Sequence, residues 1–174
     1  MPADPDMMAD LLWLQVCYYF GDQANTGGDF ERLDEYLELA TNLAPKWPVP
    51  YYFAAIVLPM ATGSVDTGMK FLDTAILHHP NTWQFPFFKG MYLMMHKNDL
   101  LGAGENLHQA ALLPGSPKYL ANLSASLASK IGKRRLAYLY LQEALATTDD
   151  PAQKEIITKK FKELFKGEAP VEME

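Results

Sequence analysis

Apolar residues recur along most of this chain at the three- and four-residue spacings of helices, and no segment keeps the strict alternation of a β-strand. Glycine and proline residues and an Asn-Asp pair separate the apolar segments and indicate turns. The pattern therefore predicts an all-α protein. We expect helices over about residues 8–20, 29–43, 51–61, 65–78, 85–97, 99–112, 118–131, 133–147 and 151–166.

A single period runs through these predicted helices. Small residues recur at spacings of 35, 35 and 34 positions, at Ala40, Ala75, Ala110 and Ala144. A leucine stands three positions before each of them, at Leu37, Leu72, Leu107 and Leu141. Turn residues stand nine positions before the leucines, at Gly28, Gly63, Asn98 and Gly132. These columns predict four helical hairpins that stack, with leucine in the core and alanine where two helices approach closely.

The repeat resembles the tetratricopeptide repeat (TPR) family. The second helix of that family carries an alanine, a large apolar residue four positions later and a small residue three positions after that. The third and fourth units match this signature, at Ala103, Leu107 and Ala110 and at Ala137, Leu141 and Ala144. The first two units begin it instead with Leu33 and Gly68. The resemblance implies a right-handed α-solenoid of about four hairpins.

The amphipathic helix expected over 151–166 would close this stack, because its apolar residues lie on one side and lysine and glutamate on the other. We therefore predict one domain over 7–166, a helix stop at Gly167 and a disordered acidic tail over 167–174. Two features depart from a simple repeat. The polar connection over 21–28 predicts an insertion, and Pro59 predicts a kink or an early end of the helix that contains it.

The helix over 85–97 is the most aromatic and methionine-rich segment of the chain. Phe87 and Met94 occupy the two large positions of the family's first helix, but Met91 stands where the family has a small residue, and Gly90 lies one position early. We expect the side with Phe87, Met91 and Met94 to face the core. The neighbouring side carries Phe85, Phe88, Tyr92 and Met95.

In the TPR family the first helix of each unit lines a concave groove that binds extended peptides. The resemblance assigns eleven residues of this chain to such a groove: Phe53, Val57, Met60, Phe88, Tyr92, Met95, His96, Asn122, Ser126, Ser129 and Lys130. Some members hold a peptide carboxylate with lysine, arginine and asparagine, and only Asn122 and Lys130 would suit that role. An apolar or aromatic ligand is therefore expected, with methionine supplying adaptable contacts.

The sequence leaves open three interpretations of the side that carries Phe88, Tyr92 and Met95. These residues could pack internally, line a groove for a partner, or mediate self-association. Trp13, Tyr18 and Tyr19 in the first helix raise the same question.

The charge pattern argues against nucleic acid as a partner. The formal net charge is −6, and glutamates dilute the lysines near the C-terminus. Cys17 is the only cysteine, so no internal disulfide is possible. The apolar segment 11–20 is too short to span a bilayer. The start also resembles bacterial repeat proteins in which such a helix follows a membrane anchor. We expect a location in the cytoplasm or in the soluble part of a membrane-associated complex.

Residues with catalytic potential are sparse. The four histidines lack metal-ligand spacing and are expected at the surface or at helix ends: His78, His79, His96 and His108. The acidic cluster near the start of the second helix is expected to be an exposed helix face: Glu31, Asp34, Glu35 and Glu38. We therefore predict a non-enzymatic scaffold without cofactor or metal that binds a protein or peptide. The alternatives are a self-associating or membrane-complex subunit and, less favoured by the residues, an enzyme on a helical scaffold.

Overall fold

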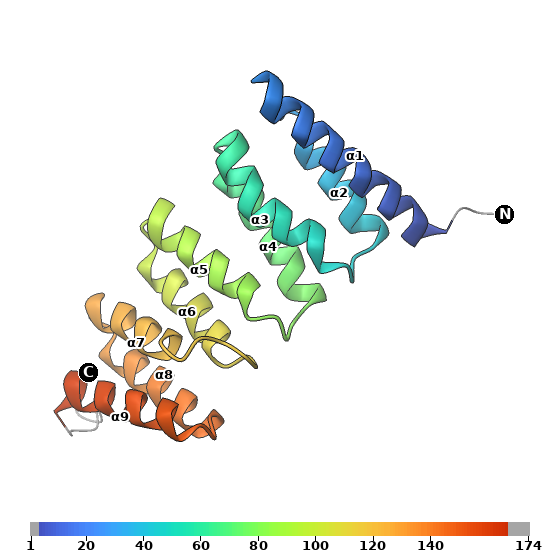
Figure 1. The fold of residues 1–174 in the computed structure, drawn as a ribbon. Helices are drawn as coiled ribbons and strands as arrows, with labels where there is room; N and C mark the ends of the chain where they lie inside the picture. Colours follow the sequence, from blue (N-terminus) through green and yellow to red (C-terminus); the bar gives the residue numbers. More distant parts are fainter. Residues whose placement is uncertain (1–3, 167–174) are drawn as a thin grey trace. The chain divides into compact units, whose positions relative to one another are not determined.

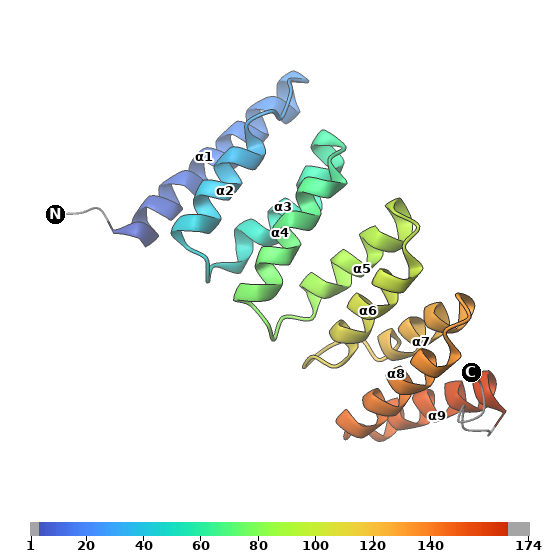
Figure 2. The ribbon, with the colours of Figure 1, turned by 180° about the vertical axis from the view of Figure 1, so that it is seen from behind.

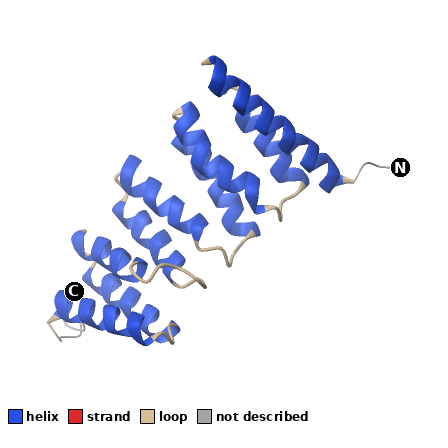
Figure 3. Ribbon diagram, viewed as in Figure 1, coloured by secondary structure: helices blue, strands red, loops and turns tan. Residues whose placement is uncertain are grey.

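The computed structural model describes residues 4–166 of the chain. Within that range the regular elements are all α-helices and no strand occurs, so the all-α prediction is confirmed (Figure 3). The helices are α1 (Pro5–Thr26), α2 (Leu33–Leu43), α3 (Pro48–Thr62), α4 (Val65–His78), α5 (Gln84–His96), α6 (Leu100–Ala111), α7 (Leu120–Lys130), α8 (Arg134–Thr147) and α9 (Pro151–Phe165). They form two compact units, one of α1–α4 and one of α5–α9.

The first unit consists of two helical hairpins (Figures 1 and 2). α1 pairs with α2 and α3 pairs with α4, and the hairpins meet where α2 packs on α3. An aromatic cluster also joins α1 to α3. The Trp13 ring meets Trp47 and Phe53 edge-on, with centroids 5.5 and 5.4 Å apart, and Phe20 meets Phe53 at 5.3 Å. Phe53 is therefore part of the internal packing of this unit.

The second unit adds a single helix to two hairpins. α5 pairs with α6, α7 pairs with α8, α6 packs on α7, and α9 lies against α8 and α7. α9 buries Ile157 and Phe165. Near its end, Arg134 of α8 donates a hydrogen bond to the Leu164 carbonyl at 3.0 Å. α9 thus covers one side of the last hairpin with its apolar face, as the sequence pattern predicts.

The repeat columns line the cores of both units. The four repeat leucines and the four repeat alanines are all buried: Leu37, Leu72, Leu107, Leu141, Ala40, Ala75, Ala110 and Ala144. Each lies on the second helix of its hairpin. Repeat-like helical packing is therefore confirmed, and each column marks one core position that recurs in successive hairpins.

The first helix is longer than the sequence pattern predicts. α1 continues through Thr26 and ends at Gly27, whose φ is 68°, so most of the predicted insertion over 21–28 is helical. The next helix begins at Leu33 rather than at 29. The prediction is wrong because residues 22–26 are mostly polar, as on an exposed helix surface, and polarity alone does not distinguish such a surface from a loop.

The helix that contains Pro59 does not end early. α3 runs on to Thr62 and stops at Gly63, whose φ is 69°. The proline ring lies close to α4, because a Cβ atom at Gly68 would approach Pro59 Cγ to 2.9 Å. The absent side chain of Gly68 therefore makes room for the proline ring between the two helices.

The last helix, α9, ends at Phe165. Lys166 adopts the left-handed conformation, with φ 49°, and its N–H donates to the Lys162 carbonyl. The predicted stop at Gly167 and the predicted tail over 167–174 lie outside the described residues.

His108 lies in the last turn of α6, at a helix end as expected, but it is buried rather than exposed. It is buried between α6 and α8, where its ring stacks on Tyr140 with centroids 4.0 Å apart and an interplanar angle of 15°. Its Nε2 lies 2.9 Å from Glu143 Oε2. Two neighbours in the folded chain thus accommodate the imidazole, and neither is adjacent to it in sequence.

Tyr140 makes the stability of the second unit sensitive to alkaline pH. Burial, with a smaller effect of Glu105, raises the pKa of Tyr140 from 10.0 to about 12. The unfolded chain would lose this proton first, so stability should be unaffected below about pH 10 and fall as pH rises toward 12. We expect Tyr140→Phe to reduce that loss. Urea unfolding of both proteins at pH 9 and pH 11.5 tests this, and an equal loss in the two proteins would contradict it.

Candidate interaction surfaces

The residues that α5 buries most deeply differ from its predicted core side, which consists of Phe87, Met91 and Met94. Phe85, Pro86 and Gly90 are its buried residues. A Cβ atom at Gly90 would lie 2.8 Å from Leu107 Cγ and 3.1 Å from the Ala103 carbonyl oxygen. Gly90 is therefore the small residue at the close approach to α6, one position before Met91, where the family pattern has it.

The remaining apolar residues of α5 are covered to different degrees. Phe87 and Met94 are partly buried against the core of the second unit, as predicted. Met91, which shares their predicted side, is also half-buried. Phe85, at the start of the other side, is completely buried rather than open. The side with Phe85, Phe88, Tyr92 and Met95 therefore begins in the core at Phe85 and becomes exposed at Met95, near the end of the helix.

The predicted groove residues of α5 and α3 occupy equivalent positions in the repeat. We call Phe53, Val57 and Met60 the α3 face, and Phe88, Tyr92 and Met95 the α5 face; each pair is separated by 35 positions. The first two residues of each face are half-buried. The last is largely exposed, by 82% at Met60 and 66% at Met95. Both faces therefore end in an exposed methionine at the same repeat position.

The side chains of the two faces also have neighbours within their own units. Phe53 packs on Trp13 and Phe20, as described above. The Phe88 ring lies 5.6 Å from Phe87 between centroids, and the Tyr92 ring lies 5.8 Å from His96. Burial raises the pKa of Tyr92. The aromatic residues are thus held in place, while the methionines extend beyond them into solvent.

The third predicted set, on α7, has a different character. The Asn122 side-chain amide donates to the Ile156 carbonyl of α9 at 3.3 Å. Ser126 donates to the Asn122 carbonyl at 2.7 Å, and Lys130 is exposed. α9 therefore contacts Asn122 at the start of this set. Lys130, the last residue of the set, is exposed, as are Met60 and Met95 at the ends of the α3 and α5 faces.

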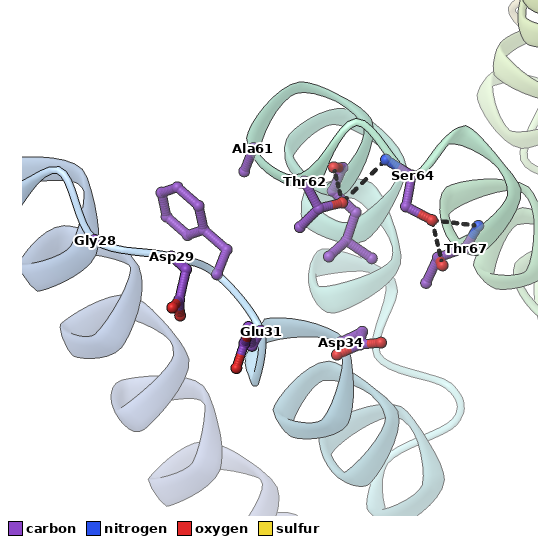
Figure 4. Close-up of a pocket in the computed structure, with 10 residues that line it drawn as sticks. Gly28, Asp29, Glu31, Asp34, Ala61, Thr62, Ser64 and Thr67 are labelled. Carbon is purple, nitrogen blue, oxygen red and sulfur yellow. Dashed lines mark hydrogen bonds between the residues drawn. The ribbon is translucent and has the colours of Figure 1, made fainter.

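A cavity in the first unit lies beside the connection from α1 to α2 and the turn from α3 to α4. It measures about 410 Å³, and its walls include Asp29, Glu31 and Asp34 (Figure 4). Across from these acids, Ser64 and Thr67 turn toward each other, and their hydroxyls lie 2.6 Å apart. The Ser64 hydroxyl also caps α4 by accepting from the Thr67 N–H. The hydroxyl groups thus serve the turn itself.

Sequence reasoning raised the exposure of Tyr18 as a question but did not identify the regular apolar surface of α1 to which this residue belongs. Met7, Leu11, Leu14 and Tyr18, which we call the α1 stripe, are each 54% to 74% exposed. Trp13 and Tyr19, in contrast, face inward: Trp13 joins the aromatic cluster, and the Tyr19 hydroxyl donates to the Asp29 carbonyl at 3.2 Å. The steps of 4, 3 and 4 residues within the α1 stripe were a signal that could have revealed it.

Among residues 4–166, no group of three or more histidine, cysteine, aspartate or glutamate side chains is placed to hold a metal ion. Within the same range no helix is both long and apolar enough to cross a bilayer.

Comparison with known proteins gives no family for this chain. No protein-family model matches the sequence, and no curated protein matches it either. The similarity to the TPR family therefore rests on the repeat columns and stays a prediction.

Proposed function

We propose that this protein is a TPR-like scaffold, a right-handed solenoid of four hairpins without enzymatic activity, that binds an apolar segment of another protein. The observation that carries the proposal is the exposure of Met60 and Met95 at equivalent repeat positions. Each stands beside half-buried apolar residues on the first helix of its hairpin. Because successive hairpins share one architecture, the two methionines stand at the same place within their own hairpins.

The chemistry of the α3 and α5 faces indicates the class of ligand. Methionine is flexible and polarisable, so it adapts to apolar side chains of varied shape. The partly covered aromatic and aliphatic residues beside it provide a rigid wall, which lowers the entropy lost on binding. A protein segment with apolar or aromatic side chains fits both properties. Nucleic acid fits poorly, because the chain is acidic and the two faces contain no cation.

The proposal also includes the cellular location of the protein. A scaffold of this kind would act in the cytoplasm or in the soluble part of a membrane-associated complex. No cofactor is needed for either role.

Binding of selected peptides tests the proposed function. Peptides selected from a random library on the purified chain should be rich in apolar and aromatic residues. We expect the double variant Met60→Ser, Met95→Ser to weaken their binding at least tenfold. Because both methionines are largely exposed, the thermal midpoint should hardly change.

The matched control for this variant is Leu77→Ser on α4, since Leu77 is 79% exposed but lies outside both faces. It should bind the selected peptides as the parent chain does. Equal affinity of the parent chain and the methionine variant for every selected peptide would contradict the proposal. A second variant, Phe88→Ala with Tyr92→Ala, should also lose binding while retaining helicity. A collapse of its melting transition would assign those two residues to the core instead.

A further inference from the structure

The α1 stripe is an apolar surface on the side of its helix opposite the core. Steps of 4, 3 and 4 residues keep Met7, Leu11, Leu14 and Tyr18 within an arc of about 60° on the helix surface. Ala9 and Val16, the buried residues of α1, point in the opposite direction. Four large apolar side chains in one exposed line form a contiguous patch, which is characteristic of an interaction site.

An acidic and aromatic cavity borders this stripe at the start of α1. It measures about 510 Å³ and is lined by Asp6 and Asp10 of α1 and by the segment between α2 and α3: Ala44, Pro45, Lys46, Trp47 and Pro48. On the helix surface, Asp10 lies between the α1 stripe and the side that carries Trp13. Neither carboxylate is in an ion pair with Lys46 among the interactions of the described residues. The rings of Trp47 and the prolines can pack along the stem of a long side chain, and the carboxylates can accept its charge.

The charge of α1 decides which occupant fits this surface. The helix carries Asp6, Asp10 and Asp22 and no lysine or arginine. Pairing the helix with α1 of a second copy would bring two acidic helices together, so the contact would have no attractive charge pair. The basic helix α9 of a second copy is also a poor fit, because Ile156 is the only large apolar side chain that it exposes among the described residues. Charge and apolar area together favour a different protein with basic residues beside an apolar face.

We propose that the α1 stripe and the adjoining cavity at Asp6, Asp10 and Trp47 dock an amphipathic helix of another protein, whose basic side chains flank its apolar face. The apolar face of the partner covers the α1 stripe, and one lysine or arginine enters the cavity. This site is carried by residues different from those of the α3 and α5 faces, so either proposal can fail without the other.

A designed peptide pair tests the docking site on the full chain. The probe is a fluorescently labelled synthetic helix with leucine on one face and lysine on the other, and its control has glutamate in place of every lysine. The lysine peptide should bind, and the glutamate peptide should bind at least tenfold more weakly. Leu11→Ser with Leu14→Ser should weaken binding of the lysine peptide at least tenfold, with an unchanged melting curve because both leucines are exposed.

A pair of charge variants separates the specific site from general attraction to an acidic chain. Asp6→Asn with Asp10→Asn should lower affinity about fivefold and reduce its salt dependence. Glu31→Gln with Glu35→Gln removes the same charge elsewhere in the unit and should have less than a twofold effect. Equal losses in the two charge variants would overturn the proposal, as would unchanged binding in the leucine variant. Sedimentation that shows a dimer broken by the leucine variant would also overturn it, because the second copy would then be the occupant.

Discussion

Replacing Leu107 by alanine is expected to lower the free energy of unfolding of the second unit by about 2–5 kcal/mol. Leu107 is completely buried on α6, and its Cγ fills the space left open by Gly90 of α5. Removing its isobutyl group loses the transfer free energy and leaves a cavity, because the helix backbones around it cannot close fully. Urea unfolding followed by circular dichroism measures the change.

The control for this variant is Leu101→Ala on the same helix. Leu101 is exposed, so its replacement should change the free energy of unfolding by less than about 0.5 kcal/mol. If both variants lost the same small amount, Leu107 would not occupy a packed core position, and the repeat column it belongs to would lose its structural meaning.

Gly90→Ala should destabilise the second unit by about 1–3 kcal/mol, although alanine is the better helix former by about 1 kcal/mol. The added methyl group would lie within 2.8 Å of Leu107 Cγ and 3.1 Å of the Ala103 carbonyl oxygen. One of these atoms is in a buried side chain and the other is in a helix backbone, so neither can move aside at little cost. Thermal and urea unfolding both report the loss.

Gly104→Ala is the matched control, since Gly104 is also buried in a helix of this unit. The nearest atom to a Cβ there is the Ser124 carbonyl oxygen at 3.6 Å, which is an ordinary contact. This variant should be neutral or more stable by up to about 1 kcal/mol.

A double variant links the two predictions. Gly90→Ala should cost less when Leu107 is already alanine, because the cavity accepts the methyl group. Strictly additive losses would contradict direct contact between these residues.

The repeat carried most of the fold information that the sequence contains. Leu37, Leu72, Leu107 and Leu141 recur because each successive hairpin places a leucine at the same core position, so the period alone indicates burial. Helix ends were predictable where a cap or glycine marks them, as at Ser64 before α4 and Gly63 after α3. α1 also ends at a glycine, Gly27, but the mostly polar residues 22–26 before it gave no sign that the helix continues that far.

Close approach between helices was harder to predict. Gly90 could have been identified as the contact residue from its size, but the family alignment placed the small position at Met91. The partners of His108 could not be predicted from the sequence pattern, because Tyr140 and Glu143 lie on another helix and only the fold brings them next to the imidazole.

The candidate surfaces, too, were only partly predictable from the sequence. Their residues could be assigned from the repeat, because Phe53 and Phe88, and likewise Met60 and Met95, stand 35 positions apart. Their exposure could not be assigned, because a run of apolar residues looks the same whether a neighbouring helix covers it or not. The structure separates Phe53, which packs on α1, from Met60, which extends into solvent.

The methionine methyl resonances offer the most direct test of the central claim, that the α3 and α5 faces bind an apolar protein segment. The chain contains nine methionines, and Met60 and Met95 can be assigned by single substitution. In a titration of the methyl-labelled chain with a selected peptide, the account predicts saturable shifts at Met60 and Met95 and none at Met7 and Met8 of α1. Saturable binding that leaves the Met60 and Met95 resonances in place would contradict it.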